Sequence, residues 1–505
     1  MRQAISHSGI RFRLLAGGLS LLLGLSAQAA SYAVPHAALS LLPGDGQQAE
    51  VRHARDTVAG AALPDLGLSP PAGRAHVGLE TMFSSQQGSW YFEPFVNNGL
   101  FRAIAGYQAH HPQAVVISGG SITLDQMAAS LSDPRVLRRH KDGYLLSYPL
   151  VIAPGAALLI EDTALYLYTY SGTALINRGL LSLKGATLSS WNGEQPQSTQ
   201  DPYRPFVMAW AGSQVRIEGS RLLRLGYNAN LARGITTALS TQQPASTAPA
   251  RVLVRDSEFT DLSTGLELQH AQARIQGSRF NDQQQYAVDL RDGQVEVAGN
   301  QIRGVQNNSG VRVRGEVRGL IAGNQVLDTA KSAIEVVEQR GALGIRQNLL
   351  GASRGNGILL GQMAPTQDQP LLVEGNLIGN TQGSGIDASE VGGALFLVDN
   401  QVGNTPEYAI SLRNTQRLSG SLVLTGNTLG GIGKAMVRVE GLEQIVLGGN
   451  RYQGSPVLQN FLIGDLLPVQ SQVLEGTVRH PCLLRVRTGV AVPATDLVVD
   501  DSCRG

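Results

Sequence analysis

The sequence predicts an all-β fold, a right-handed parallel β-helix of about ten coils with a small N-terminal helical cap. Two repeating strand patterns and the composition lead to this prediction. The chain has 60 glycines among its 505 residues, and only 16% of its residues are charged. Glycine adopts the left-handed backbone angles that tight turns between short strands require. The low charge disfavours charged helical bundles and disordered polyelectrolytes.

The first pattern is an apolar strand that ends in Ser or Asn. In three successive copies the last residues are Ser257, Ser278 and Asn300, which lie 21 and 22 residues apart (278 − 257 and 300 − 278). Asn at such a turn tolerates left-handed angles and can hydrogen-bond the Asn of the neighbouring coils. The copies are Val215–Ser220, Val252–Ser257, Ala273–Ser278, Val295–Asn300, Leu320–Asn324, Leu371–Asn376, Leu395–Asn400, Leu422–Asn427 and Ile445–Asn450.

The second pattern is a six-residue strand with a small residue second, an aliphatic residue third and usually another aliphatic residue fifth. Alternation at period two places the third and fifth residues on one face and the fourth and sixth on the other. A repeat of this length is too short for a propeller blade and lacks the leucine-rich consensus, but it fits one β-helix coil, whose equivalent residues stack about 4.8 Å apart. A β-sandwich is the alternative architecture. The copies are Thr264–Gln269, Tyr286–Arg291, Ser309–Arg314, Ser332–Val337, Asn356–Gly361, Ser384–Ser389 and Tyr408–Arg413.

The N-terminal residues 1–29 are typical of a cleaved secretory signal. Arg2, Arg11 and Arg13 precede the apolar run Leu14–Leu25, which the small residues of Ala27–Ala29 follow. A charged start, a short apolar core and an A-x-A end are the features of such a signal. No later stretch reaches the roughly 18 apolar residues that a membrane span needs. The sequence therefore predicts an exported protein located in the periplasm, without a membrane span.

The remaining chain divides into four predicted segments. Residues 30–80 are rich in Ala, Pro and polar residues, and we expect them to be poorly ordered. Residues 81–150 are predicted to form an N-terminal α/β cap, because the open end of a solenoid must be covered. Residues 151–460 carry the β-helix. Residues 461–505 form a C-terminal cap.

Two cysteines and the balanced charge limit the classes of function. Cys482 and Cys503 are the only cysteines, and in an oxidising compartment we expect them to form a disulfide, with two unpaired thiols as the alternative. No HExxH, CxxC, P-loop or GxSxG motif is present, so we predict neither a metal nor a cofactor. The 40 basic and 39 acidic residues give no basic excess that would favour nucleic acid.

The outward fourth and sixth positions are the candidate ligand contacts. The fourth position is Glu267, Asp289, Arg312 and Glu335 in four successive coils. Acids and arginines alternating along a shallow face suit a linear polymer, and the planar fork of arginine binds both oxygens of a carboxylate. A solvated ladder of self-neutralising charges is the alternative interpretation. The sixth position in the same coils is Gln269, Arg291, Arg314 and Val337.

Four short motifs in the chain are Ala174-Leu175-Ile176-Asn177, Tyr203-Arg204-Pro205-Phe206, Trp210-Ala211-Gly212 and Leu225-Gly226-Tyr227. These motifs resemble those of the periplasmic mannuronan C5-epimerases of alginate biosynthesis. They lie between Gly155 and Thr236, and the resemblance continues at lower similarity to about Gly361. It implies a β-helix in the periplasm that binds an acidic polysaccharide, with a polysaccharide export complex as a further partner.

The chain departs from the family at the catalytic signature. The family has Tyr-Gly-Ile-Asp-Pro-His-Asp in one coil, where this chain has Tyr286–Asp292 (YAVDLRD). Both aspartates, Asp289 and Asp292, and the tyrosine match, but the family's general-base histidine corresponds to Arg291. The family's Ser-Arg-Glu-Val aligns with Arg314–Val317, which places the carboxylate-neutralising arginine on Gly315, next to Arg314.

Epimerisation removes the C5 proton beside a carboxylate and returns a proton from the other face, so it needs a cationic neutraliser and a base. Arg291, Arg312 and Arg314 could neutralise the carboxylate. Arginine itself cannot be the base because its pKa exceeds about 12. The candidate bases are His270, Asp289, Asp292 and Tyr286. The resemblance and the columns predict substrate contacts by Glu267, Arg312, Glu335, Tyr227 and Tyr286.

Three functions therefore remain open. The first is an epimerase-like isomerase that converts mannuronate to guluronate in a uronate polymer. The second is a non-catalytic β-helix that binds an exported acidic polysaccharide and guides or protects it, which the missing histidine favours. The third is a polysaccharide lyase, which shares the enolate-like step and adds β-elimination.

Overall fold

The computed structural model describes residues 37–82, 90–95, 100–109, 111–193, 203–454, 461–479, 482–489 and 497–499. The predicted signal of residues 1–29 lies outside these ranges, as does Cys503. No helix among the described residues is both long and apolar enough to cross a membrane.

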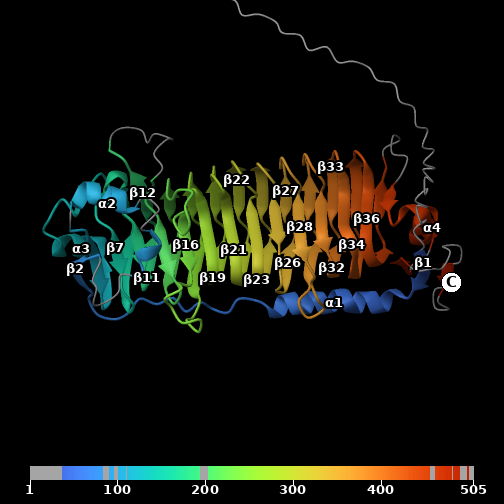
Figure 1. The fold of residues 1–505 in the computed structure, drawn as a ribbon, viewed down its shortest axis with the longest axis horizontal. Helices are drawn as coiled ribbons and strands as arrows, with labels where there is room; N and C mark the ends of the chain where they lie inside the picture. The colour runs from blue at the N-terminus through green and yellow to red at the C-terminus, as the bar shows by residue number, and fades with distance from the viewer. Residues whose placement is uncertain are drawn as a thin grey trace, which may run out of the picture. The chain divides into compact units, whose positions relative to one another are not determined.

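The described chain folds as a right-handed parallel β-helix, which confirms the predicted fold class (Figure 1). Each coil passes through three strands, which belong to three faces of the solenoid. In one coil these are β16 (Gly234–Ala238) on the first face, β17 (Ala250–Arg255) on the second and β18 (Glu258–Thr260) on the third. In the next coil β19 (Thr264–Gln276) runs without a break through the first and second faces and bends at His270, whose φ is 51°.

The first face is formed by the strands that open each coil, and it carries the candidate site. In β19, β21, β23, β34 and β36 only the N-terminal half lies on this face. Its strands are β7 (Leu150–Ile152), β10 (Leu175–Asn177), β13 (Val207–Trp210), β16, β19, β21 (Tyr286–Ala298), β23 (Val311–Ala322), β25 (Ile334–Val337), β28 (Ile358–Met363), β31 (Ile386–Val391), β34 (Tyr408–Thr425), β36 (Ala435–Gly448) and β38 (Leu462–Gly464).

The second and third faces complete the coils. The C-terminal halves of the long strands belong to the second face, together with β8 (Ala156–Glu161), β11 (Leu180–Lys184), β14 (Gln214–Glu218), β17, β26 (Leu343–Arg346), β29 (Leu371–Glu374) and β32 (Gly393–Val398). The third face is β6 (Gly143–Leu146), β9 (Ala164–Tyr168), β12 (Thr187–Trp191), β15 (Arg221–Leu223), β18, β20 (Arg279–Asn281), β22 (Gln301–Val305), β24 (Gln325–Thr329), β27 (Leu349–Gly351), β30 (Leu377–Gly379), β33 (Gln401–Thr405), β35 (Thr428–Ile432) and β37 (Arg451–Gln453).

The described solenoid has 13 coils rather than about ten. The sheet that contains the third face has 14 strands, of which β5 (Leu137–His140) pairs antiparallel with β6, and the other 13 follow one per coil. The Ser/Asn motif misses some coils because their turns use other residues. The turn after β8 is Asp162-Thr163, and the turn after β11 is Gly185-Ala186.

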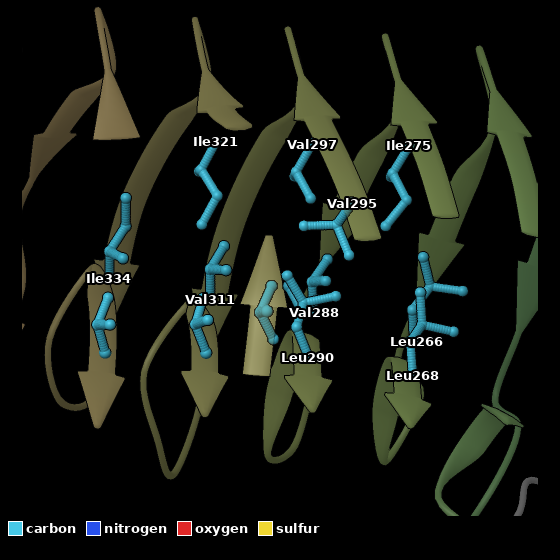
Figure 2. Close-up of a cluster of buried hydrophobic side chains, with 14 of the residues drawn as sticks. Leu266, Leu268, Ile275, Val288, Leu290, Val295, Val297, Val311, Ile321 and Ile334 are labelled. Atoms are coloured by element: carbon cyan, nitrogen blue, oxygen red, sulfur yellow. The ribbon is translucent and has the colours of Figure 1, made fainter. Parts of the chain in front are cut away.

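Aliphatic side chains fill the lumen in columns, as the period-two alternation predicts. Leu266 lies opposite Val288, which lies opposite Val311, which lies opposite Ile334. These side chains are fully buried and stack from coil to coil (Figure 2). Burial of such side chains stabilises each coil by about 25 cal/mol per Å² of apolar surface removed from water.

A ladder of asparagines, all buried except the half-buried Asn450, runs along the turn between the second and third faces. The side-chain amide of Asn376 donates to Oδ1 of Asn400 at 3.0 Å and to the carbonyl of Ile345 at 2.8 Å. Its own Oδ1 accepts from both the backbone and the side-chain nitrogens of Asn348. The same bonds recur along the ladder of Asn300, Asn324, Asn348, Asn376, Asn400, Asn427 and Asn450.

We expect Asn376→Ala to lower the free energy of unfolding by about 3 kcal/mol, because buried donors and acceptors lose their partners on both sides. Chemical denaturation measures this change. Asn307→Ala is the control, since its exposed amide makes one bond to the Gln284 carbonyl, and it should change stability by less than about 0.5 kcal/mol. Equal stabilities of the two variants would show that the ladder is dispensable.

Residues 37–80 form defined elements, whereas their composition predicts poor order. Strand β1 (Ala37–Leu42) pairs antiparallel with β39 (Leu483–Thr488) and parallel with β40 (Leu497–Val499). Helix α1 (Gly44–Gly60) packs along the second face (Figure 1). The composition obscured its apolar stripe, which follows helical spacing. Its buried residues Val51, Ala54 and Val58 contact the cluster that includes Leu372, Phe396 and Val423.

The chain after α1 stays on the second face and is held there by arginines. Arg251 and Arg274 donate to the carbonyls of Leu66 and Leu63 at 2.6 and 2.8 Å, and Arg216 donates to the carbonyl of Leu68. A segment rich in Pro and Ala therefore takes its order from bonds to the solenoid, not from its own secondary structure.

Helices and short strands cover the N-terminal end. Helix α2 (Leu100–Gln108) lies within residues 81–150, and α3 (Leu124–Ser130) begins at a capping box formed by Thr123 and Gln126. The remaining elements are the 3-10 helices η1 (Glu93–Phe95) and η2 (Thr169–Ser171) and the strands β2 (His76–Thr81), β3 (Gln113–Ser118) and β4 (Gly120–Thr123).

At the C-terminal end η3 (Leu467–Val469) leads into α4 (Gln470–Arg479) and then into β39, which pairs with β36. Cys482 is disulfide-bonded. Its predicted partner, Cys503, lies outside the described residues, so the pairing stays a prediction.

Candidate functional site

The first face carries a polar cleft of about 400 Å³ over β16, β19, β21 and β23. Part of its wall comes from the outward positions of these strands and part from the turns that precede them. The lining residues are Asn228, Asn230, Arg233, Glu267, Gln269, Gln285, Tyr286, Arg291, Asn308, Arg312 and Arg314.

The strand register aligns the two outward columns as the sequence predicts. Glu267 lies opposite Asp289, Asp289 opposite Arg312, and Arg312 opposite Glu335. In the sixth position, Gln269, Arg291, Arg314 and Val337 follow in the same order. The charged side chains therefore form neighbouring rungs on the outside of the solenoid, none of them turned into the lumen.

Asp289 and Arg312 form a closely paired unit at the base of the cleft. Nε of Arg312 lies 2.9 Å from Oδ1 of Asp289, and Nη2 lies 2.6 Å from Oδ2. The Asp289 side chain is 2% exposed and that of Arg312 is 16% exposed, so the two charges neutralise each other largely out of water. Arg314 approaches the same Oδ2 at 3.4 Å. Bidentate geometry of this kind fixes the guanidinium in one orientation.

Tyr286 completes this unit. Nη1 of Arg312 donates to the Tyr286 hydroxyl at 2.7 Å, and its guanidinium carbon lies 4.0 Å from the ring centroid. Burial raises the pKa of Tyr286, although the positive charge of Arg312 opposes the shift. The phenol therefore keeps its proton at neutral pH and stands beside a cation that would stabilise its anion.

Glu267 is a buried carboxylate with only partial compensation. Nη1 of Arg233 lies 3.2 Å from its Oε1, and Thr236 and Gln269 donate weakly to it at 3.5 and 3.4 Å. Burial raises the pKa of Glu267, Arg233 opposes the rise, and the negative charge of Asp289 adds to it. A carboxylate with a raised pKa is better matched to taking a proton from carbon than an ordinary surface glutamate.

The cleft is cationic overall. Four arginines, Arg233, Arg291, Arg312 and Arg314, face two carboxylates, Glu267 and the underlying Asp289. Arg312 is occupied by Asp289, whereas Arg291 is 52% exposed and its nearest carboxylate, that of Asp292, lies 3.6 Å away. With Asp292 counted, four arginines face three carboxylates, and the remaining positive charge in a concave site attracts an anionic ligand.

Two of the predicted catalytic residues lie outside this cleft. His270 and Asp292 line a separate cavity of about 610 Å³ beside the end of α1. His270 Nε2 lies 3.1 Å from the carbonyl of Thr247, and Asp292 accepts a hydrogen bond from the backbone nitrogen of Glu316 at 2.7 Å. The strands bend at these positions, where both residues have a positive φ, and the bend directs the seventh position away from the sixth.

Gly315 shows the same bend. Its φ is +77°, and a Cβ atom there would lie 2.2 Å from Oδ1 of Asp292. An arginine at this alignment position would be strained by the positive φ and would require the Asp292 side chain to move, and Arg314, one residue earlier, faces the cleft instead.

Two residues that are predicted to contact the substrate, Tyr227 and Glu335, do not belong to the described lining of the cleft. Tyr227 packs its ring against Tyr203, at 5.3 Å between centroids, and Phe206, at 6.2 Å, in an apolar cluster at the border of the cleft. Glu335 accepts a hydrogen bond from Ser309 at 2.7 Å and does not belong to the lining.

The turns contribute residues that the column analysis misses. Arg233, Gln285 and Asn308 precede first-face strands, and Asn228 and Asn230 come from the longer turn before β16. These positions lie outside the repeating strand pattern, so alternation does not place them. The motif Leu225-Gly226-Tyr227, which directly precedes Asn228, is the sequence feature that could have pointed to these turn residues.

Comparison with known proteins gives consistent results. The family model described as a right-handed β-helix region matches residues 245–429. The mannuronan C5-epimerase of Pseudomonas aeruginosa is 26% identical over 223 residues, which are 42% of this chain and 41% of that protein. The mannuronan C5-epimerase AlgG of Azotobacter vinelandii is 25% identical over 289 residues, 52% of this chain and 55% of that protein. The chain thus spans about half the length of these curated relatives.

A solved structure shares the fold over a longer stretch. The crystal structure of the periplasmic alginate epimerase AlgG matches with a TM-score of 0.65 and 18% identity, covering 78% of this chain and 98% of that one. At this identity the structural match shows the fold alone. Together with the sequence relatives, it confirms the resemblance that the four short motifs indicate.

Proposed function

We propose that this relative of the mannuronan C5-epimerases is a polysaccharide-modifying protein of the periplasm that binds a uronate polymer across the first face and epimerises it at C5. The observation that supports this most is the cleft itself, in which four arginines surround the buried Glu267 and the Asp289–Arg312–Tyr286 unit. The named activity of the relatives supports the substrate class.

In the proposed complex Arg291 and Arg314 bind the carboxylate of the reacting uronate. They are stacked in the sixth position and line the cleft, while Arg312 is held by Asp289. Two guanidinium forks neutralise the sugar carboxylate, which stabilises the enolate-like intermediate that follows loss of the C5 proton. The amides of Gln269, Gln285 and Asn308 offer hydrogen bonds to the hydroxyls.

Glu267 then acts as the base and Tyr286 as the acid. The C5–H bond breaks, its proton passes to the Glu267 carboxylate, and the electron pair is delocalised into the neutralised sugar carboxylate. Tyr286 returns a proton to C5 from the opposite face, and Arg312 stabilises the resulting phenolate at 2.7 Å. Exchange of both groups with water restores the resting state, so that no redox partner or cofactor takes part.

The pH profile follows from the raised pKa of Glu267. The base must be ionised, so the rate is expected to fall as the pH drops through the pKa of Glu267, which burial places above the usual glutamate value of 4.5. When the initial rate of guluronate formation is measured between pH 4 and 8, the decline of the rate toward acid pH (the acid limb) should have its midpoint above pH 4.5. An acid limb at or below that value would remove Glu267 from the base role.

A second candidate function is binding without turnover, in which the solenoid guides or protects a polysaccharide during export. It is favoured by the absence of histidine from the described lining of the cleft, where Arg291 stands at the position of the family's base. Incubation with polymannuronate followed by proton NMR separates the functions. Guluronate signals indicate an epimerase, a 4,5-unsaturated end indicates a lyase, and an unchanged spectrum with retained binding indicates the binding protein.

A further inference from the structure

A second tyrosine–arginine cluster lies on the first face near the C-terminal end of the solenoid. The Tyr408 ring has the guanidinium carbon of Arg438 at 5.4 Å and Nζ of Lys434 at 5.6 Å from its centroid, both within cation–π range. The strand sequence Tyr408–Arg413 (YAISLR) repeats Tyr286–Arg291 (YAVDLR) at four of six positions. The cluster therefore reproduces the local pattern of the cleft.

The register places corresponding residues in the same columns. Ser411 lies opposite Arg438, as Asp289 lies opposite Arg312 in the cleft. The strands between the two clusters are β23, β25, β28 and β31, so Tyr408 is five strand steps from Tyr286. At a spacing of about 4.8 Å per step, the two clusters are about 24 Å apart along the solenoid.

The second cluster includes two ion-paired cations and, within the described structure, one unpaired cation, Arg413. Arg438 pairs with Glu440 at 2.8 Å, and Lys434 pairs with Glu407. Arg413 is exposed and has no ion pair among the described residues. Lys434 and Arg438 thus contact the Tyr408 ring, and Arg413 adds an exposed cation, unpaired in the described part of the chain, at the sixth position of the same strand.

The stretch between the clusters allows an extended chain to lie flat. Its sixth positions are Val337, Gly361 and Ser389, which are short side chains in one continuous column. The fourth positions include the carboxylates of Glu335 and Asp387, which can accept hydrogen bonds from sugar hydroxyls but repel sugar carboxylates. Attraction for a polyanion is therefore concentrated at the two ends of the stretch.

We propose that Tyr408, Arg413, Lys434 and Arg438 form a second subsite that binds the same uronate polymer about 24 Å from the cleft. This inference rests on the proposed function. A polymer that reaches both clusters gains affinity through the second contact, because that contact becomes intramolecular once the first has formed. A chain shorter than the separation gains nothing from it.

The test compares the full chain with the double variant Arg413→Gln/Lys434→Gln. The control is Arg279→Gln/Arg303→Gln, which removes two exposed cations from the third face and leaves the same net charge. Affinity is measured by calorimetry with two oligomannuronates, one shorter than the separation and one at least twice as long. We expect the site variant to bind the long oligomer about fivefold more weakly and the short one unchanged, with native affinities for the control.

Unchanged affinity of the site variant for the long oligomer would overturn the second subsite while leaving the cleft in place. Equal weakening for both lengths would also overturn it, because the two cations would then act on the cleft or the fold. Failure of the native chain to bind either oligomer would overturn the proposed function as well. Should the double variant unfold, Arg413→Gln alone repeats the comparison, since its exposed side chain is free of ion pairs in the described structure.

Discussion

Glutamine in place of Glu267 is expected to lower the rate of guluronate formation by roughly 10²–10⁴-fold, the usual cost of removing a positioned general base. Affinity for polymannuronate should stay the same or increase, because the substitution keeps the shape of the side chain and removes a negative charge beside the bound uronate. Rates by time-resolved proton NMR and affinities by calorimetry measure the two effects separately.

Glu335→Gln is the matched control. Glu335 occupies the same column but lies outside the described lining of the cleft and is bonded to Ser309. Its rate should remain within about twofold of the native rate. Equal rates for the native protein and Glu267→Gln would show that another group acts as the base.

Glutamine in place of Arg312 should lower the free energy of unfolding by about 3 kcal/mol, because it leaves Asp289 buried with one distant partner, Arg314 at 3.4 Å. The same change should weaken polymer binding and raise the barrier to proton return, since Tyr286 loses the cation at its hydroxyl. Denaturant unfolding and calorimetry measure these quantities.

The double variant Arg312→Met/Asp289→Leu distinguishes stability from function. Replacing both members of a buried ion pair by apolar residues of similar volume is often neutral or stabilising. We expect this double variant to recover most of the lost stability but neither affinity nor turnover. Recovery of activity with stability would mean that the pair only supports the fold.

The sequence was sufficient for the parts of the fold that depend on periodicity. Alternation at period two and stacking of equivalent residues determine which side chains share a column, so the order from Glu267 through Asp289 to Arg312 followed from spacing alone. Helix α1 did not follow, because its stripe at Val51, Ala54 and Val58 is meaningful only against the apolar patch on the second face.

The site was predictable only where it lies on straight strands. His270 and Asp292 share a column, as expected, but the backbone bends there into positive φ and carries both residues into another cavity. Spacing in sequence does not reveal such a bend. Arg233 comes from a turn of irregular length. Glu267 is suited to the proposed base role because burial raises its pKa, and the sequence alone does not show that burial.

Solvent deuterium incorporation tests the C5 chemistry of the cleft most directly. Native protein is incubated with polymannuronate in D₂O, and the C5 position of newly formed guluronate is examined by NMR and mass spectrometry. Proton removal by Glu267 and return from exchangeable Tyr286 predict guluronate that carries deuterium at C5, and no such product with Glu267→Gln. Polymannuronate recovered unchanged, without guluronate or deuterium, would contradict catalysis in this cleft.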